Sequence, residues 1–139
     1  MPAMHQHKET VRKFFDAIWN NADKAVIPDL LCEDFSFRGT LGHMQRGHAG
    51  FALYMDFIRR ALGNYRCEIV DMVAEDDRIY ARMSYSGIHR GELFGYAPTH
   101  GKLKWDGVAV FTFRDGKIAE LWVLGDLHSV MKQLARYLE

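Results

Sequence analysis

The sequence has little of what would indicate a disulfide framework, a membrane span or a nucleic-acid interface. Its 139 residues include two cysteines and three prolines, and no apolar run is long enough to cross a bilayer. Eighteen Lys and Arg balance eighteen Asp and Glu, so the formal net charge is zero. Because nucleic acids and anionic membranes attract proteins with a basic excess, we expect neither as a partner.

The two cysteines, Cys32 and Cys67, have no second cysteine at the spacing of a metal or redox site. We interpret both as small buried hydrophobic residues. His43 and His48 lie five residues apart without a carboxylate at ligand spacing, so no metal is expected. Residues 1–7 hold no apolar core of signal-peptide length, and we expect a frayed N-terminus and a cytoplasmic protein.

Apolar and aromatic residues are plentiful, at 48% and 13% of the chain. The length fits one domain, residues 1–139, which is large enough to bury a core that contains a cavity. Apolar stripes at helical spacing predict three amphipathic helices. Their stripes are Val11, Phe14, Phe15, Ile18 and Trp19, then Phe51, Tyr54, Met55, Ile58 and Leu62, and finally Leu127, Val130, Met131, Leu134 and Leu138.

Shorter elements connect the first two helices. Ala25–Leu31 is typical of a short helix, Phe35–Phe37 of a short strand, and the glycine-rich run Gly39–Gly50 of a loop. Beyond Gly63 the apolar period changes to two, which predicts long strands. The predicted strands are Tyr65–Ala74, Arg78–Arg90, Leu103–Phe113 and Lys117–Gly125, with hairpin turns at Asp76-Asp77 and Asp115-Gly116 and a longer connection over Glu92–Gly101.

Helices and strands are segregated along the chain, which predicts an α+β fold. We expect a curved antiparallel sheet wrapped around the N-terminal helices. Such a sheet forms a cone, and the inside of the cone is a natural ligand cavity.

Several stretches together resemble the SnoaL-like polyketide cyclases, or ester cyclases, of the nuclear transport factor 2-like superfamily. The resemblance covers nearly the whole chain, and the block that ends at Asp126 is its most specific part. The stretches are Gly39–Gly42 with Arg46–Gly50, Gly91–Gly95 with Pro98–Lys102, Asp115–Asp126 and Met131–Leu134.

The resemblance implies a cone-shaped fold, related to the cystatin-like roll, that pairs as a homodimer through the outer face of the sheet. It also implies acid–base chemistry without a cofactor. In the family, an aspartate at the position of Asp126 takes a proton from a carbon between carbonyls, and the enolate closes a ring. Two departures are clear: the strand Lys104–Phe113 has no histidine where ring cyclases carry one, and His100 is an extra residue.

Asp126 has two interpretations. The strand pattern places it on one face with Ile118, Glu120, Trp122 and Leu124, where an apolar cavity would raise its pKa towards that of a general base. Alternatively, Asp126 caps the last helix by accepting a hydrogen bond from the amide of Ser129. His128 is either an exposed helix residue or a partner that shares a proton with Asp126.

The other candidates are histidines and aromatic residues. His43, His48 and His89 are either ordinary loop or strand residues or donors to a substrate oxygen at the rim of the cavity. Six aromatic residues are either plain core or a wall for a flat ligand: Trp105, Trp122, Phe15, Trp19, Tyr54 and Tyr85. The hydroxyls of Tyr54 and Tyr85 could in addition polarise a carbonyl.

The sequence supports two main functional hypotheses. The first is an enzyme that cyclises, isomerises or dehydrates a small apolar carbonyl compound, with Asp126 as its base. The second is a carrier that holds a small hydrophobic molecule in the same cavity without chemistry, with Asp126 as a helix cap. A purely structural dimerisation domain is a third interpretation.

Overall fold

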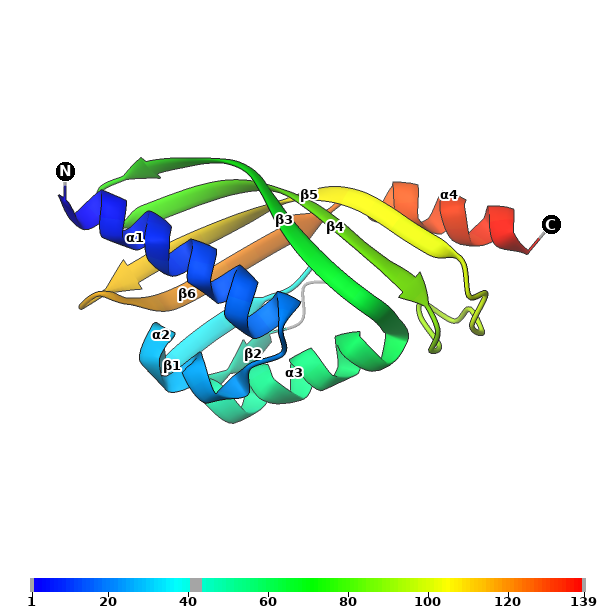
Figure 1. The fold of residues 1–139 in the computed structure, drawn as a ribbon, viewed down its shortest axis with the longest axis horizontal. Coiled ribbons are helices and arrows are strands. Elements are labelled where there is room, and N and C mark those ends of the chain that lie inside the picture. Colours follow the sequence, from blue (N-terminus) through cyan, green and yellow to red (C-terminus); the bar gives the residue numbers. More distant parts are fainter. Residues whose placement is uncertain (1, 41–43, 139) are drawn as a thin grey trace.

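The computed structural model describes residues 2–40 and 44–138. These residues form an α+β fold of helices and one sheet, as predicted (Figure 1). In chain order the elements are α1 (Pro2–Lys13), the π-helix η1 (Phe14–Asn20), the 3₁₀ turn η2 (Lys24–Val26), α2 (Ile27–Leu30), β1 (Leu31–Arg38), β2 (Met44–Arg46), α3 (Gly47–Ala61), β3 (Leu62–Glu75), β4 (Arg78–His89), β5 (Lys102–Arg114), β6 (Lys117–Gly125) and α4 (Leu127–Tyr137).

The six strands form one curved sheet in the order β2-β1-β6-β5-β4-β3. Neighbouring strands are antiparallel except β1 and β6, which run parallel. Figure 1 shows α1 and α3 along the inner side of this curve, and α4 at the end opposite the N-terminus. The fold prediction is confirmed, including the curved sheet around the N-terminal helices.

The long strands and both hairpin turns lie where the alternating pattern places them. At the second turn, Asp115 and Gly116 have φ values of 53° and 82°. A two-residue turn with both residues at positive φ matches the twist of the strands that it joins, which explains the Asp-Gly sequence there.

Two predictions about the first fifty residues are wrong. Residues 2–7 belong to α1 and are not frayed, and the ring of His7 stacks on Phe113 with centroids 4.0 Å apart. The stretch 39–50 is not all loop, because Met44–Arg46 pairs with β1 and α3 begins at Gly47. Both cysteines were expected to be buried: Cys67 is buried in β3, whereas Cys32 is only half-buried in β1.

An extra residue in β6 decides which side chains face the interior. Ile118 pairs with Phe113 and Glu120 pairs with Thr112, so Ala119 has no partner in β5. A bulge of this kind shifts the side-chain alternation by one residue. After it, Leu121 and Val123 face inward, and Trp122 faces outward with 41% of its surface exposed.

Aromatic rings form the centre of the core. Phe14 of η1 contacts Phe51 of α3 and Phe111 of β5, with ring centroids 5.7 and 5.4 Å apart. All three rings are fully buried. Since these rings come from the helical layer and the sheet, they fix the distance between the two layers that enclose the site.

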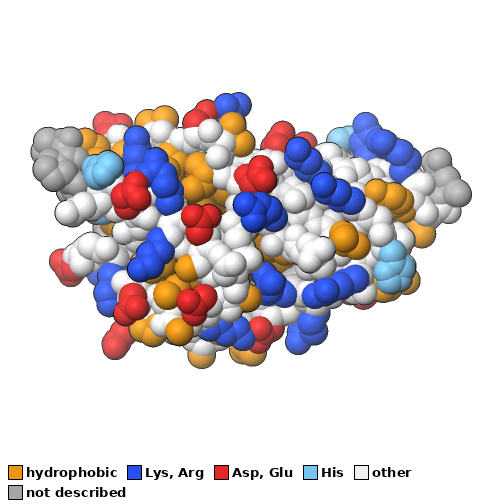
Figure 2. Space-filling view, in the orientation of Figure 1, with side chains coloured by type: hydrophobic (Ala, Val, Ile, Leu, Met, Phe, Trp, Pro, Cys, Tyr) orange, Lys and Arg blue, Asp and Glu red, His pale blue; other side chains and the backbone are white. Residues whose placement is uncertain are grey.

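The surface carries both signs of charge. On the face in Figure 2, Lys and Arg side chains lie among Asp and Glu over most of the molecule, with basic side chains more frequent towards α4. Within the described residues, no helix has the length and apolar character needed to cross a membrane.

Candidate ligand pocket

A pocket of about 680 Å³ lies between the inner face of the sheet and the helices η1 and α3. Most of the side chains that line it are apolar, and aromatic rings come from nearly every segment around it. These rings include Phe15, Trp19, Phe37, Tyr54, Tyr65, Tyr85 and Trp105. The pocket has the size and the apolar lining typical of small-molecule sites.

One wall consists of Tyr65, Tyr85 and Trp105, which come from the neighbouring strands β3, β4 and β5. Tyr85 and Trp105 are direct partners across β4 and β5, with centroids 5.7 Å apart. Tyr65 lies 6.5 Å from Tyr85 and 6.3 Å from Trp105, and the three rings are within about 33° of parallel. The inward positions of three strands thus bring together three nearly parallel aromatic rings.

A second group of lining rings consists of Trp19, Tyr54 and Phe37, which come from η1, α3 and β1. Trp19 stands nearly perpendicular to Tyr54 and to Tyr65, at 86° and 73°. The π-helix η1 places Phe14, Phe15, Ile18 and Trp19 all in buried positions. π-helical turns are rare and often occur at functional sites.

The polar groups deep in the pocket are three tyrosine hydroxyls and one thiol. Burial raises the pKa of Tyr54 to about 12 and that of the Cys67 thiol to about 12. Burial also raises the pKa values of Tyr65 and Tyr85 well above their ordinary range. At neutral pH these groups are uncharged, so the hydroxyls can donate a hydrogen bond to a ligand oxygen.

The mouth of the pocket includes a tight turn over residues 92–95. The carboxylate of Glu92 accepts a hydrogen bond from the amide of Gly95 at 2.8 Å, and Leu93 and Tyr96 exchange two backbone hydrogen bonds at 3.1 and 2.9 Å. Phe94 has φ 52°, a left-handed conformation that is rare for a bulky residue. The turn is therefore held by its own hydrogen bonds against local strain.

The structure brings together five of the aromatic residues that the sequence predicts for the site. Trp105, Tyr54, Tyr85, Phe15 and Trp19 line the pocket. The placement of Trp122 in the cavity is wrong, because the β6 bulge turns its ring to the outer face. There the guanidinium of Arg38 lies 5.2 Å from the ring centroid. The prediction for His43 lies outside the described residues.

Asp126 and His128 lie at the rim and do not line the pocket. Asp126 is exposed, and its carboxylate accepts a hydrogen bond from the amide of Ser129 at 3.1 Å, as a helix cap does. Its chain neighbours reach the pocket: Leu127 lines it, and the amide of Gly125 donates to the hydroxyl of the lining residue Thr40 at 3.0 Å. His128 is exposed in the first turn of α4.

The two other candidate histidines make structural contacts. Nε2 of His48 donates to the carbonyl of Leu31 at 3.0 Å. His89 is fully buried, and its Nδ1 accepts a hydrogen bond from the amide of Thr99 at 3.2 Å. Among the described residues, no three His, Cys, Asp or Glu side chains gather where they could hold a metal ion.

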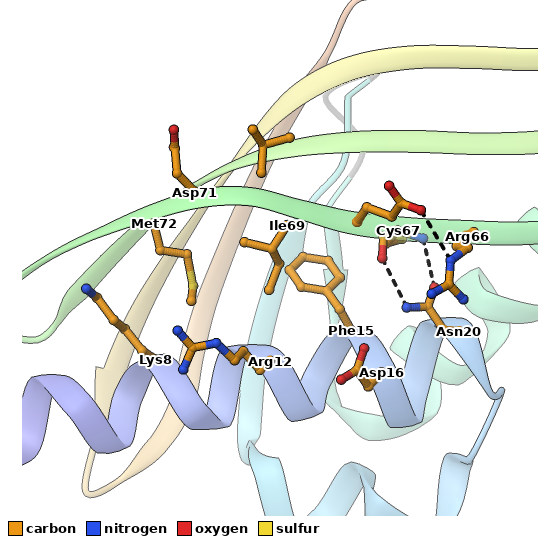
Figure 3. Close-up of a pocket in the computed structure, with 12 residues that line it drawn as sticks. Lys8, Arg12, Phe15, Asp16, Asn20, Arg66, Cys67, Ile69, Asp71 and Met72 are labelled. Atoms are coloured by element: carbon orange, nitrogen blue, oxygen red, sulfur yellow. Dashed lines mark hydrogen bonds and ion pairs between the residues drawn. The ribbon is translucent and has the colours of Figure 1, made fainter.

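A second hollow of about 530 Å³ runs between α1, η1 and β3. Figure 3 shows Lys8, Arg12 and Asp16 along the helix and β3 above them. The carboxamide of Asn20 accepts from the amide of Cys67 at 2.8 Å and donates to its carbonyl at 3.0 Å. Charged side chains of both signs line this hollow, whereas the inner pocket has the enclosed apolar walls expected of a small-molecule site.

Sequence reasoning missed several residues of the pocket, among them Tyr65, Cys67, Phe37 and Glu92. For Tyr65 and Cys67 a signal was present, because both have inward parity on a strand of alternating pattern. Glu92 had no such signal, since its position depends on the folded turn 92–95.

The profile of the SnoaL-like polyketide cyclase family matches residues 9–134. No protein with a curated description matches the chain. Solved structures match it closely in fold. A protein assigned as a SnoaL-like polyketide cyclase from Jannaschia sp. CCS1 superposes with a TM-score of 0.88 at 20% identity, over 96% of this chain and 94% of that one.

Two further structures extend the likeness. IdmH of Streptomyces antibioticus, assigned as a polyketide cyclase, has a TM-score of 0.82 at 21% identity and covers 94% of this chain and 99% of its own. A protein of ketosteroid isomerase-like fold from Catenulispora acidiphila DSM 44928 has a TM-score of 0.78 at 16% identity, over 91% and 92% of the two chains. The likeness of fold and the extent of the profile match agree, and the chain belongs to the SnoaL-like polyketide cyclase family.

Proposed function

We propose that the protein binds a small apolar carbonyl compound in the inner pocket and carries out cyclase-type acid–base chemistry on it without a cofactor. One observation carries the proposal: an aromatic pocket of about 680 Å³ is lined by Tyr54 and Tyr85, whose hydroxyls are uncharged at neutral pH. Protonated hydroxyls in a site shielded from water suit an oxygen that gains negative charge.

In the proposed reaction, Asp126 takes a proton from a carbon that lies between two carbonyl groups. The electron pair of the broken C–H bond moves onto a carbonyl oxygen, and Tyr54 and Tyr85 donate hydrogen bonds to this enolate. In a cyclisation the enolate carbon then bonds to a second carbonyl carbon of the same molecule, whose oxygen takes up a proton. His128 is the candidate partner that shares the proton with Asp126.

The position of Asp126 also favours a second candidate function. Its carboxylate is exposed and bound to the Ser129 amide, so it must rotate to reach a ligand in the pocket. If it stays in place, the protein is a carrier that holds the molecule without reaction.

Deuterium exchange separates the two functions without knowledge of the natural substrate. Benzoylacetone carries the required C–H group between two carbonyls, and NMR in D₂O follows the loss of that proton. We expect the wild-type protein to accelerate exchange and Asp126→Asn to abolish the acceleration, because an amide cannot accept the proton. Glu120→Gln is the control, because Glu120 is exposed on β6, the strand that precedes Asp126. This variant should accelerate deuterium exchange as much as wild type.

Binding of benzoylacetone, measured by the fluorescence of the pocket tryptophans, completes this test. Binding without acceleration by the wild type leaves the carrier function, and full activity of Asp126→Asn contradicts the role of Asp126. If no apolar carbonyl probe binds, both functions are contradicted.

We also propose that two copies pair through the outer face of the sheet. Exposed apolar side chains gather there on neighbouring strands: Tyr80 on β4, Val108 on β5, and Trp122 and Leu124 on β6. Val108 pairs directly with Leu124, so these side chains are adjacent on one face. An exposed apolar patch of this kind is typical of protein interfaces.

A further inference from the structure

Among the described residues, the side chains that line the inner pocket carry charge of only one sign. Among the described residues that line it, Glu92 is the only one with a charged side chain, and no Lys, Arg or His joins it. The thiol of Cys67 and the hydroxyls of Tyr54 and Tyr85 are neutral at pH 7, and burial raises their pKa values further. The pocket therefore offers no cationic partner among these residues to an anionic ligand.

A nearby arginine lies outside the lining of the pocket, although its charge acts on the thiol of Cys67. Arg59, on α3, donates from Nη1 to the carbonyl of Trp19 at 2.8 Å and does not line the pocket. This hydrogen bond directs the guanidinium of Arg59 to a carbonyl in the last turn of η1.

The aromatic walls favour positive charge. The face of an aromatic ring is negative, and a cation within about 6 Å of it is attracted. Trp19 stands nearly perpendicular to Tyr54 and Tyr65. These rings meet edge to face, so the walls hold rings in more than one orientation.

Glu92 is held in position at the mouth. The amide of Gly95 binds its Oε1 at 2.8 Å, and the turn that presents it is fixed by the two hydrogen bonds between Leu93 and Tyr96. The other carboxylate oxygen has no hydrogen-bond partner among the described residues. An anchored carboxylate beside an aromatic pocket is the chemistry that recognises ammonium groups.

We infer that the pocket takes a ligand with an apolar or aromatic body and an ammonium group, and that Glu92 is the counter-ion for that group at the mouth. The inference deepens the proposed function and rests on it, because it names the charge class of the molecule that enters the same pocket.

Three naphthalene probes that differ in charge test this inference by isothermal titration calorimetry. They are (2-naphthylmethyl)trimethylammonium, the neutral 2-naphthylmethanol and the anionic 2-naphthylmethanesulfonate. We expect the ammonium compound to bind best and the sulfonate worst. Glu92→Gln should weaken binding of the ammonium compound roughly two- to fivefold and leave the alcohol unchanged.

Glu120→Gln is the matched control, because it removes the same charge from the outer face of the sheet. It should leave the affinity for the ammonium compound unchanged, and the indole NMR signal of Trp105 should shift with each probe that enters the pocket. The inference is overturned if the alcohol or the sulfonate binds as tightly as the ammonium compound, or if Glu92→Gln and Glu120→Gln behave alike.

The outcomes distinguish this inference from the function on which it rests. If the alcohol binds in the pocket and the ammonium compound binds no better, the ammonium class is wrong and the apolar-ligand function stands. If none of the three probes binds, both are wrong.

Discussion

Among single residues, the buried polar groups of the pocket differ most from their behaviour in water. Burial raises the pKa values of Cys67, Tyr54 and Tyr85 because it disfavours their charged forms, so these groups stay protonated well above neutral pH. Their role in the pocket is thus to donate hydrogen bonds. A thiol with a raised pKa is also a poor nucleophile, which argues against covalent chemistry at Cys67.

Cys67 should make the free energy of unfolding fall at alkaline pH. In the unfolded chain its thiol ionises near the ordinary pKa of 9.0, and burial raises the folded-state pKa to about 12. The resulting stability is complete below pH 9 and is lost as the pH rises towards 12. Between pH 7 and pH 10.5 we expect the thiol to account for a loss of about 2 kcal/mol.

Urea unfolding at these two pH values measures that loss. Cys67→Ala should lose about 2 kcal/mol less than wild type, since the tyrosines contribute equally to both. Equal losses in the two proteins would show that the thiol is not protected.

At the scale of elements, α4 depends on Asp126 for its first turn. Asp126→Ala should lower the free energy of unfolding by about 1 kcal/mol, because the amide of Ser129 loses its acceptor. Asp126→Asn should cost much less, since Asn is a good cap. Chemical unfolding of the two variants checks this, and an unchanged stability of Asp126→Ala would contradict the cap.

The pair of variants also separates capping from chemistry. Asn keeps the cap and removes the proton acceptor, so activity that is lost in Asp126→Asn without loss of stability belongs to the carboxylate itself.

The sequence predicts an element well when nearby residues determine it, and poorly when a contact with a distant residue does. The strands β3 to β6 and their hairpins follow from alternation and from turns such as Asp115-Gly116, which act over a few residues. The start of α1 could not be predicted in this way, because His7 is held by Phe113 from the far end of the chain. β2 has three residues and exists only through its pairing with β1.

For the pocket residues, too, local patterns were predictive and an irregularity of the strand pairing was not. Trp105, Tyr54 and Tyr85 have the correct parity or helical spacing and line the pocket as predicted. Trp122 has the same apparent parity as Ile118, but the extra residue Ala119 reverses it. The bulge itself cannot be located from the sequence, although the charge of Glu120, which shares the parity of Trp122, was a signal that this side chain faces outward.

For the whole molecule, a substitution at the outward-facing Trp122 tests the proposed dimer. We expect the wild type to be a dimer at micromolar concentration and Trp122→Glu to be a folded monomer, because a charge would be buried in the paired faces. Size-exclusion chromatography with light scattering measures the mass. Leu138→Glu, an exposed apolar position after α4, is the control and should remain dimeric.

A monomeric wild type would remove the dimer proposal. It would leave the pocket untouched, because the pocket and the outer face lie on opposite sides of the sheet.

The carboxamide of Asn20 has a consequence for how copies of this protein can meet. β3 is an outer strand of the sheet, and such a strand can recruit a strand from another chain through its free amides and carbonyls. By occupying both backbone groups of Cys67, Asn20 acts as a one-residue substitute for that missing neighbour. At this position the edge of β3 has no free backbone groups for a strand of another molecule. Asn20 therefore protects this part of the sheet against aggregation by strand addition at high protein concentration.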